Sequence, residues 1–351
     1  MTEPATTGPG GPLLIEPGMG MPLLQVNELH VRIGTRRGVV RAVDGVSLAV
    51  GAGEAVGVVG ESGSGKSMML RAIMGLLPPE AEITDGQVLL DGVDLTQLDN
   101  SQLNKLRGPR MAMIFQEPMS ALNPVMRVGP QIAEGPLVHL GLGRAAAAQR
   151  ALELMRRVGI PDPERRFRSF PHEFSGGMRQ RVMIAIALSC EPQLILCDEP
   201  TTALDVTIQD QILRLLTRLC RESGTSLIFV THDLPVVAQV CQRLAVMYAG
   251  RIVERGTVQE VLTQPCHPYT LGLVRSAPDV DHPRASLAAI PGSPPSLITP
   301  PSGCRFHPRC KFAEEDCTTD EPPLRVLRSG RATACLHYER TQDVQPLGAE
   351  R

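Results

Sequence analysis

The apolar and polar positions of the chain alternate in a way that predicts a sheet flanked by helices. Short apolar runs separated by turns predict strands between residues 23 and 59, and the last run stops at a glycine-rich loop. From Ser175 onward the pattern switches regularly, with helices predicted over 178–189 and 208–222 and strands over 194–197 and 226–231. Such alternation is typical of a parallel sheet covered by helices.

The segments between these two regions complete the prediction. A helix over 66–74 follows the glycine-rich loop, a strand and turn region spans 86–94, and 111–115 has the pattern of an apolar strand. Residues 128–170 have a helical pattern. The alternation fades near Leu262, and the prolines that follow it predict a linker into a cysteine-containing tail.

Composition excludes several classes of function. The 351 residues carry a formal net charge of -2, so electrostatic binding of nucleic acid or anionic lipid is not expected as the main activity. No stretch approaches the ~20 consecutive apolar residues of a membrane-spanning helix, so any role at a membrane requires partner subunits. Residues 1–22 are rich in glycine and proline, lack the features of a signal peptide, and are expected to be a disordered leader.

The glycine-rich loop matches the phosphate-loop pattern GxxxxGK[ST], and it lies between a predicted strand and a predicted helix. Its residues are Gly60, Glu61, Ser62, Gly63, Ser64, Gly65, Lys66 and Ser67. The backbone N–H groups are expected to surround the phosphates of ATP, with Lys66 beside the β and γ phosphates and Ser67 as a ligand of Mg²⁺.

Two acids follow the predicted strand 194–197. Asp198 is expected to hold Mg²⁺ through water, and Glu199 is expected to polarise the attacking water as a general base. An apolar run that ends in two acids is by itself a common strand end. Together with a phosphate loop earlier in the chain it indicates a Walker B motif.

A second glycine motif narrows the class. Phe174-Ser-Gly-Gly-Met178 resembles the LSGGQ signature of ATP-binding cassette (ABC) proteins. Ser175, Gly176 and Gly177 at the start of a predicted helix would form a second anion cradle. In the ABC family this cradle completes the γ-phosphate site of a partner subunit in a head-to-tail dimer.

Three further residues match landmarks of the ABC family in their order along the chain. Gln116 matches the Q-loop glutamine, which senses Mg²⁺ and the attacking water beside the contact with the membrane subunits. Ala203-Leu-Asp205 matches the D-loop. His232 matches the switch histidine, which contacts the γ-phosphate. The resemblance therefore implies catalytic roles for Gln116, Glu199 and His232.

Longer stretches are similar to the ATPase subunits of bacterial dipeptide and oligopeptide importers; they are 114–124, 170–181, 202–209 and 267–270. The resemblance implies a peripheral ATPase on the cytoplasmic face of the inner membrane. The partners that it implies are two transmembrane permease subunits, a second, paralogous ATPase and, indirectly, an extracytoplasmic binding protein, without nucleic acid. A homodimer, and nickel or glutathione as the transported substrate, stay open.

The same resemblance implies the domain organisation. The fold class is α/β, a phosphate-loop NTPase cassette with a parallel sheet core, an antiparallel β subdomain, a helical signature subdomain and a small cysteine-containing extension. The segments are the leader 1–22, the nucleotide-binding domain 23–265 with its helical subdomain at about 117–175, the extension 266–340 and a tail 341–351.

The cysteines of the first part of the chain read as ordinary core residues. Four lie in apolar or amphipathic segments and are predicted to be small buried side chains, and a fifth, Cys266, has no evident partner. The four are Cys190, Cys197, Cys220 and Cys241.

The remaining four cysteines, Cys304, Cys310, Cys317 and Cys335, lie in a proline-rich tail with little apolar content. Four thiolates that bind a metal would replace a hydrophobic core there. Their spacing is similar to that of the cysteine set in the extension of peptide-importer ATPases, which implies a 4Fe-4S cluster. Structural zinc and metal-free thiols stay open as alternatives, as do His307 and His337 as rival ligands.

Two other classes of function compete with the importer ATPase: a soluble, non-transport ABC ATPase of DNA repair or translation, and a small-molecule kinase. ABC ATPases of DNA repair insert a long coiled coil between the Q-loop and the signature, but only about 58 residues separate Gln116 from Ser175. Those of translation usually carry two cassettes, whereas this chain has one phosphate loop. A small-molecule kinase would leave the signature unexplained.

No Phe, Tyr or Trp precedes Phe115, which leaves Arg36, Arg37 or Val40 to cover an adenine base.

Overall fold

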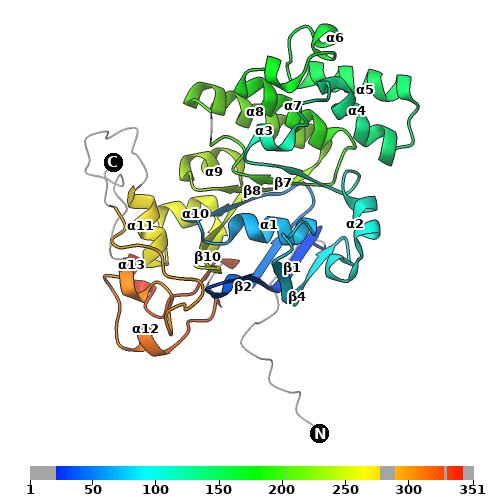
Figure 1. Ribbon diagram of the computed structural model, residues 1–351. Helices are drawn as coiled ribbons and strands as arrows, with labels where there is room; N and C mark the ends of the chain where they lie inside the picture. Colours follow the sequence, from blue (N-terminus) through cyan, green and yellow to red (C-terminus); the bar gives the residue numbers. More distant parts are fainter. Residues whose placement is uncertain (1–20, 203, 277–288, 328–329, 343–351) are drawn as a thin grey trace. The chain divides into compact units, whose positions relative to one another are not determined.

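The computed structural model of the chain describes residues 21–202, 204–276, 289–327 and 330–342 (Figure 1). They belong to two compact units: unit 1 combines 21–51, 56–96 and the described residues after 230, and unit 2 combines 52–55 with the described residues of 97–230. Nearly all of the predicted leader 1–22 and of the predicted tail 341–351 lies outside the described residues. Among the described residues, no helix is long and apolar enough to cross a membrane.

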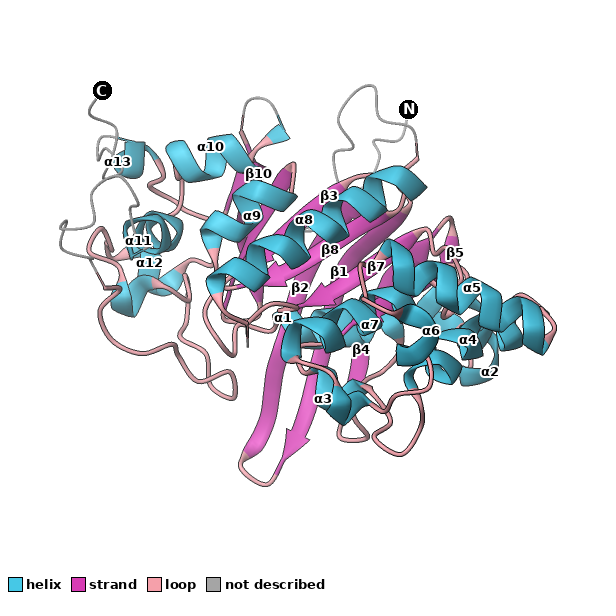
Figure 2. Ribbon diagram, turned by 90° about the horizontal axis from the view of Figure 1, so that it is seen from above, coloured by secondary structure: helices cyan, strands magenta, loops and turns pink. Residues whose placement is uncertain are grey.

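Unit 1 contains an antiparallel sheet with the strand order β2-β1-β4-β5, and its long strands are drawn in magenta in Figure 2. Buried and more exposed residues alternate along β1 and β2, because one face of such a sheet packs on the core and the other meets solvent. The strands are longer than the short ones predicted from the sequence. They are β1 Leu24–Thr35, β2 Gly38–Val50, β4 Ala81–Leu90 and β5 Val93–Asp94.

A second group of strands in unit 1 is hydrogen-bonded in the order β11-β12-β10-β9-β3, in which β3 and β9 are parallel and the other pairs antiparallel. Its strands are β3 Ala55–Val59, β9 Arg243–Tyr248, β10 Arg251–Thr257, β11 Arg325–Val326 and β12 Ala332–Thr333. The α-helices of unit 1 are α1 Lys66–Met74, α9 Leu234–Val240, α10 Val258–Thr263, α11 Pro268–Ser276, α12 Asp316–Thr319 and α13 Glu339–Gln342. Helix α1 has the predicted bounds.

The C-terminal part of unit 1 packs on the strands that precede it. The ring of Phe306 is buried, and its centroid lies 5.2 Å from that of Tyr248 and 5.5 Å from that of Tyr269. Strand β12 adds a further pairing, because it lies antiparallel to β10. This segment therefore has more apolar packing and more backbone pairing than its composition predicts.

Unit 2 contains parallel strands in the order β8-β7-β6, with bounds β6 Met111–Ile114, β7 Leu194–Asp198 and β8 Ser226–Thr231. Every residue of β7 and β8 is buried, as expected for a parallel sheet covered on both faces. The helices are α2 Asn100–Leu106, α3 Pro118–Ala121, α4 Val128–His139, α5 Arg144–Arg157, α6 Pro163–Arg166, α7 Gly176–Leu188 and α8 Val206–Ser223. The α/β class and the alternation predicted after Ser175 are confirmed.

A buried carboxylate, Asp44 in β2, joins the C-terminal part of unit 1 to the antiparallel sheet. Arg305 forms an ion pair with Asp44, and both side chains are buried. Arg32 Nη2 lies 2.8 Å and Arg251 Nη2 lies 3.3 Å from the same carboxylate. Burial raises the pKa of Asp44, but the charge of Arg305 and the hydrogen bonds from Arg32 and Arg305 outweigh it and hold this pKa well below its usual range.

We expect Asp44→Asn to lower the free energy of unfolding by about 3 to 5 kcal/mol at neutral pH, because it leaves Arg305 buried without its counter-charge. Since the folded-state pKa of Asp44 is depressed, its contribution is present above the unfolded-state pKa and is lost as the pH falls through the folded-state value. Urea unfolding at several pH values should therefore show that the two proteins converge in acid. The exposed Glu82→Gln is the control, and equal stability of Asp44→Asn and wild type at pH 7 would contradict the expectation.

Candidate functional site

The phosphate loop lies between β3 and α1, as the sequence predicts. Gly63 and Gly65 have φ values of 78° and 107°, a region that glycine adopts without strain. A Cβ on Gly65 would lie 2.2 Å from the carbonyl oxygen of Ala42. Glycine is therefore required at position 65, both by the backbone conformation and by the close approach of β2. The N-terminus of α1 follows directly, and its backbone N–H groups favour an anion.

Lys66 is buried within the loop that precedes it. Its Nζ donates hydrogen bonds to the carbonyl oxygens of Gly60 and Glu61, at 2.6 Å and 3.0 Å. Ser64 is buried as well, whereas Ser62 and Gly63 are exposed. The loop thus surrounds the lysine with its own carbonyl groups while its tip faces solvent.

Glu61 has two partners from later in the chain. Arg309 donates two hydrogen bonds to the Glu61 carboxylate, Nη1 to Oε2 at 2.7 Å and Nη2 to Oε1 at 3.0 Å. The backbone N–H of Glu61 donates to the hydroxyl of Tyr269 at 2.8 Å. Arg309 is not among the site residues that the sequence predicts. An acid inside a predicted phosphate loop was a signal, but no local pattern reveals a partner 248 positions away.

His232 is exposed and belongs to unit 1, where it precedes α9. Helix α9 packs on β3, since a Cβ on Gly57 would lie 2.6 Å from a methyl carbon of Val237. Within unit 1, the strand before the phosphate loop and the helix after His232 are therefore in direct contact.

In unit 2, the structure brings Gln116, Asp198 and Glu199 to one edge of the sheet. Strands β6 and β7 are parallel and pair Ile114 with Cys197, so their carboxyl ends lie at the same edge. Gln116 is exposed after β6, and Asp198 is buried as the last residue of β7. The carboxyl edge of a parallel sheet is where ligands bind in open α/β folds.

Glu199 has an unusual backbone conformation. Its φ of 46° is in the left-handed region, which is uncommon for a residue with a side chain. Its N–H donates to the carbonyl of Val230 at 3.0 Å, and its carboxylate accepts a hydrogen bond from the Thr202 hydroxyl at 3.0 Å. A strained residue of this kind persists only where surrounding contacts hold it. Such residues are found most often at functional sites.

The signature serine and glycines form the start of α7, also in unit 2. Ser175 is the N-cap, and its hydroxyl accepts a hydrogen bond from the N–H of Met178 at 3.4 Å. The helix begins two residues earlier than predicted, because a capping serine permits glycine in the first turn.

The D-loop acid lies beside this helix start. Asp205 is the N-cap of α8, and its carboxylate accepts a hydrogen bond from the N–H of Ile208 at 3.0 Å. A Cβ on Gly177 would lie 2.6 Å from a methyl carbon of Ile208, so the first turns of α7 and α8 are in contact. Unit 2 thus brings Ser175, Gly177 and Asp205 together. The D-loop residue Ala203 lies outside the described residues.

All four cysteines of the C-terminal segment line one cavity of unit 1, which has a volume of about 350 Å³ including space open to solvent. The remaining lining residues are His267, Pro268, Phe306, His307, Phe312, Leu336 and His337. Burial and the neighbouring thiols raise the pKa of Cys304 to about 11 and that of Cys335 to about 12. The sequence-based grouping of these cysteines is therefore matched by their positions.

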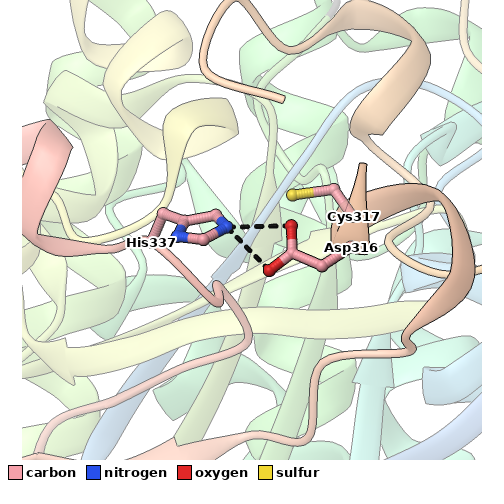
Figure 3. Close-up of side chains that lie close together, drawn as sticks. All are labelled: Asp316, Cys317 and His337. Carbon is pink, nitrogen blue, oxygen red and sulfur yellow. Dashed lines mark hydrogen bonds and ion pairs between the residues drawn. The ribbon is translucent and has the colours of Figure 1, made fainter. Parts of the chain in front are cut away.

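Figure 3 shows three potential ligands that lie close together, of which Cys317 and His337 also line the cavity. One donor atom each from Asp316, Cys317 and His337 lies within 4.8 Å of the others. His337 Nε2 lies 2.9 Å from the Asp316 carboxylate, which lowers the pKa of this acid. The second predicted rival ligand, His307, lines the same cavity, and its Nδ1 lies 2.9 Å from the carbonyl oxygen of Cys304.

Four of the other cysteines are buried, as predicted, and so is Cys266; the four are Cys190, Cys197, Cys220 and Cys241. Cys266 does have a partner, since its thiol donates to the carbonyl of Gln264 at 3.8 Å. Burial raises the pKa of Cys220 and of Cys241 to about 12, which is typical of inert core thiols.

Comparison with known proteins defines the class and then the family. The profile of the ABC transporter family matches residues 43–202, and that of the oligopeptide/dipeptide transporter C-terminal region matches residues 253–317. The dimeric ATP-binding cassette MJ0796, solved bound to ADP and Pi, is 29% identical with a TM-score of 0.61, over 67% of this chain and 98% of its own. The chain therefore has the ATP-binding cassette fold of phosphate-loop NTPases.

Individual relatives narrow this class. The oligopeptide transport ATP-binding protein OppD of Salmonella typhimurium is 48% identical, over 90% of this chain and 93% of its own length. The dipeptide transport ATP-binding protein DppD of Bacillus subtilis is 50% identical, over 89% of this chain and 94% of its own length. The chain belongs to the family of ATP-binding subunits of oligopeptide and dipeptide ABC transporters, which confirms the family predicted from the sequence.

We expect Gly65→Ala to abolish nucleotide binding and to lower the free energy of unfolding by about 2 kcal/mol or more, because the added Cβ meets the backbone of Ala42. Gly63→Ala is the matched control. It has a similar positive φ, but no atom lies within 4 Å of the added Cβ. Its free energy of unfolding should therefore fall by only about 1 kcal/mol. Chemical unfolding and nucleotide titration of both variants test this, and equal effects would show that the contact with Ala42 is unimportant.

Proposed function

We propose that this chain binds and hydrolyses ATP to energise a membrane importer, most simply one for oligopeptides or dipeptides. The observation that carries the proposal is the presence of two glycine-rich helix starts in one chain, α1 after the phosphate loop and α7 after Ser175. Helix starts of this kind favour phosphate groups. The relatives named above supply the transported class, and a nickel or glutathione importer is the alternative within the same group.

The residue roles follow the motifs of the family. Lys66 neutralises the β and γ phosphates, and Ser67 and Asp198 hold the Mg²⁺ that accompanies ATP. Glu199 acts as general base toward water, Gln116 senses Mg²⁺ and the attacking water, and His232 contacts the γ-phosphate. The strained backbone of Glu199 and its hydrogen bond from Thr202 support a fixed orientation of its carboxylate.

The proposed working form is a head-to-tail dimer of cassettes. Ser175, Gly176 and Gly177 would complete the site of a partner, which in this family is a second, paralogous ATPase, and a homodimer is the alternative. The solved cassette MJ0796, described as a dimer bound to ADP and Pi, supports this arrangement. One chain then holds only part of each of two sites. We therefore expect the isolated monomer to hydrolyse ATP slowly, because neither of its half-sites is complete.

The segment after Gln116 is the proposed contact with the two permeases. Met119, Val125 and Met126 are exposed apolar side chains of this segment, and a partner that covers them would remove their apolar surface from water. Binding there would place the chain on the cytoplasmic face of the inner membrane as a peripheral subunit. The extracytoplasmic binding protein would act only through the permeases.

For the domains, we propose the division predicted from the sequence: a nucleotide-binding domain over 23–265, with a helical subdomain at about 117–175, and an extension over 266–340. The match of the C-terminal region profile to residues 253–317 supports an extension after the nucleotide-binding domain, although this range begins 12 residues before position 265.

We also propose that Cys304, Cys310, Cys317 and Cys335 bind a 4Fe-4S cluster. Four thiols around one cavity suit that ligand set, and the extra donor His337 beside Cys317 keeps structural zinc as the alternative. Metal binding would also lower the raised pKa values of these thiols, because only the thiolates ligate. The cluster would supply a crosslink rather than electron transfer, since ATP hydrolysis needs no redox step.

We expect Glu199→Gln to reduce ATP turnover in the assembled transporter by at least about 100-fold while ATP still binds, because the amide keeps the shape but cannot act as a base. Lys66→Ala is the contrasting variant, in which nucleotide affinity itself should fall. Phosphate release and nucleotide titration separate the two effects. Wild-type turnover by Glu199→Gln would refute the role given to Glu199.

For the cysteines, we expect protein purified without oxygen to contain about four iron and four sulfide per chain and to absorb in the visible range. Cys310→Ser should lose this absorption, whereas Cys220→Ser, which changes a buried core thiol, should keep it. Stoichiometric zinc without iron would reject the cluster. Metal-free protein whose tail resists proteolysis would also reject the structural crosslink.

A further inference from the structure

The cysteine segment carries an arginine whose side chain points back to the phosphate loop. Residues 307–309 form a short 3₁₀ helix between Cys304 and Cys310. Two of the side chains in this stretch, His307 and Cys310, line the cysteine cavity, whereas the guanidinium of Arg309 binds the Glu61 carboxylate through two hydrogen bonds.

The arginine is held firmly in this position. Its side chain is only 5% exposed, compared with 25% for that of Glu61. Its Nε donates to the carbonyl of Pro291 at 2.7 Å, and its Nη1 donates to the hydroxyl of Tyr248 at 3.3 Å. The guanidinium also lies 5.9 Å from the ring centroids of Tyr248 and Phe306. A planar fork fixed in this way binds one carboxylate in one orientation.

The contact matters because of where Glu61 lies. The loop that begins at Gly60 is assigned to the phosphates of ATP, and a carboxylate within it repels that polyanion unless a cation neutralises it. Arg309 supplies this positive charge. The same glutamate also helps to hold Lys66, because its backbone carbonyl accepts a hydrogen bond from Nζ at 3.0 Å.

We propose that Arg309 is a positioning residue for nucleotide binding, which neutralises Glu61 and fixes the phosphate loop from the cysteine-containing segment. The inference rests on the proposed role of residues 60–67 as the nucleotide site. It assigns the C-terminal segment a direct influence on the affinity for ATP and ADP, through a residue that is not one of the proposed cluster ligands.

The test measures the affinity of the full-length chain for Mg·ADP by calorimetric titration, and compares each variant with wild type. Arg309→Ala should weaken binding about tenfold, because the Glu61 carboxylate is left unpaired. Arg309→Lys should weaken it less, since a lysine keeps the charge but loses the two-pronged geometry. Arg325→Ala, which removes an exposed arginine of the same segment, should leave the affinity unchanged.

The decisive variant is the double substitution Glu61→Gln with Arg309→Ala. If Arg309 acts by neutralising Glu61, removal of the carboxylate should restore the affinity to within about threefold of wild type. If Arg309 has only a structural role, the double variant should bind Mg·ADP as weakly as Arg309→Ala does, or more weakly. That result, or an unchanged affinity in Arg309→Ala, would overturn the proposal.

Two measurements keep the outcome interpretable. Arg309→Lys retains a cation at the site and provides the comparison if Arg309→Ala does not fold, since it too should be rescued by Glu61→Gln. Lys66→Ala reports on the nucleotide site itself. If Lys66→Ala loses binding and Arg309→Ala does not, only the role of Arg309 is rejected, whereas normal binding by both rejects the proposed nucleotide site.

Discussion

The close approach of backbone to backbone around the phosphate loop is the constraint on which unit 1 depends. A loop that presents N–H groups to phosphates must be glycine-rich, and here a Cβ at Gly60 or Gly65 would lie only 2.1 Å or 2.2 Å from a carbonyl oxygen of Met247 or Ala42. The loop is thus packed directly between β9 and β2. A shift of either strand would change the loop, so β2 and β9 both contribute to the geometry of one short segment.

The C-terminal segment extends this dependence to residues far away in the sequence. Arg305 binds the buried Asp44 of β2, and Arg309 binds Glu61 of the phosphate loop. Both arginines come from the stretch that also carries Cys304 and Cys310. A segment that supplies a cavity of thiols on one side and two cationic contacts on the other is therefore part of the structure around the loop rather than an appendage. Removing one partner of either ion pair would be costly, because it would leave the other charge without its partner.

Unit 2 follows a different principle, in which helix starts and strand ends carry the polar groups. Strands β7 and β8 are buried over their whole length, and the two acids of this region lie at the carboxyl edge, with Asp198 as the last residue of β7 and Glu199 directly after it. The capped starts of α7 and α8 are in contact because Gly177 leaves room for Ile208. These features explain why serine, glycine and aspartate recur at the ends of elements whose interiors are apolar.

The sequence by itself determined the class of fold, the family and the local elements around each motif. The bounds of α1 and β8 are as predicted, because periodicity and glycine act over a few residues. The lengths of β1 and β2, the pairing of β12 with β10, and the partners of Glu61 and Asp44 were decided only by tertiary structure. Those contacts join residues up to 261 positions apart, and no local pattern carries information about which distant charge will be buried against which.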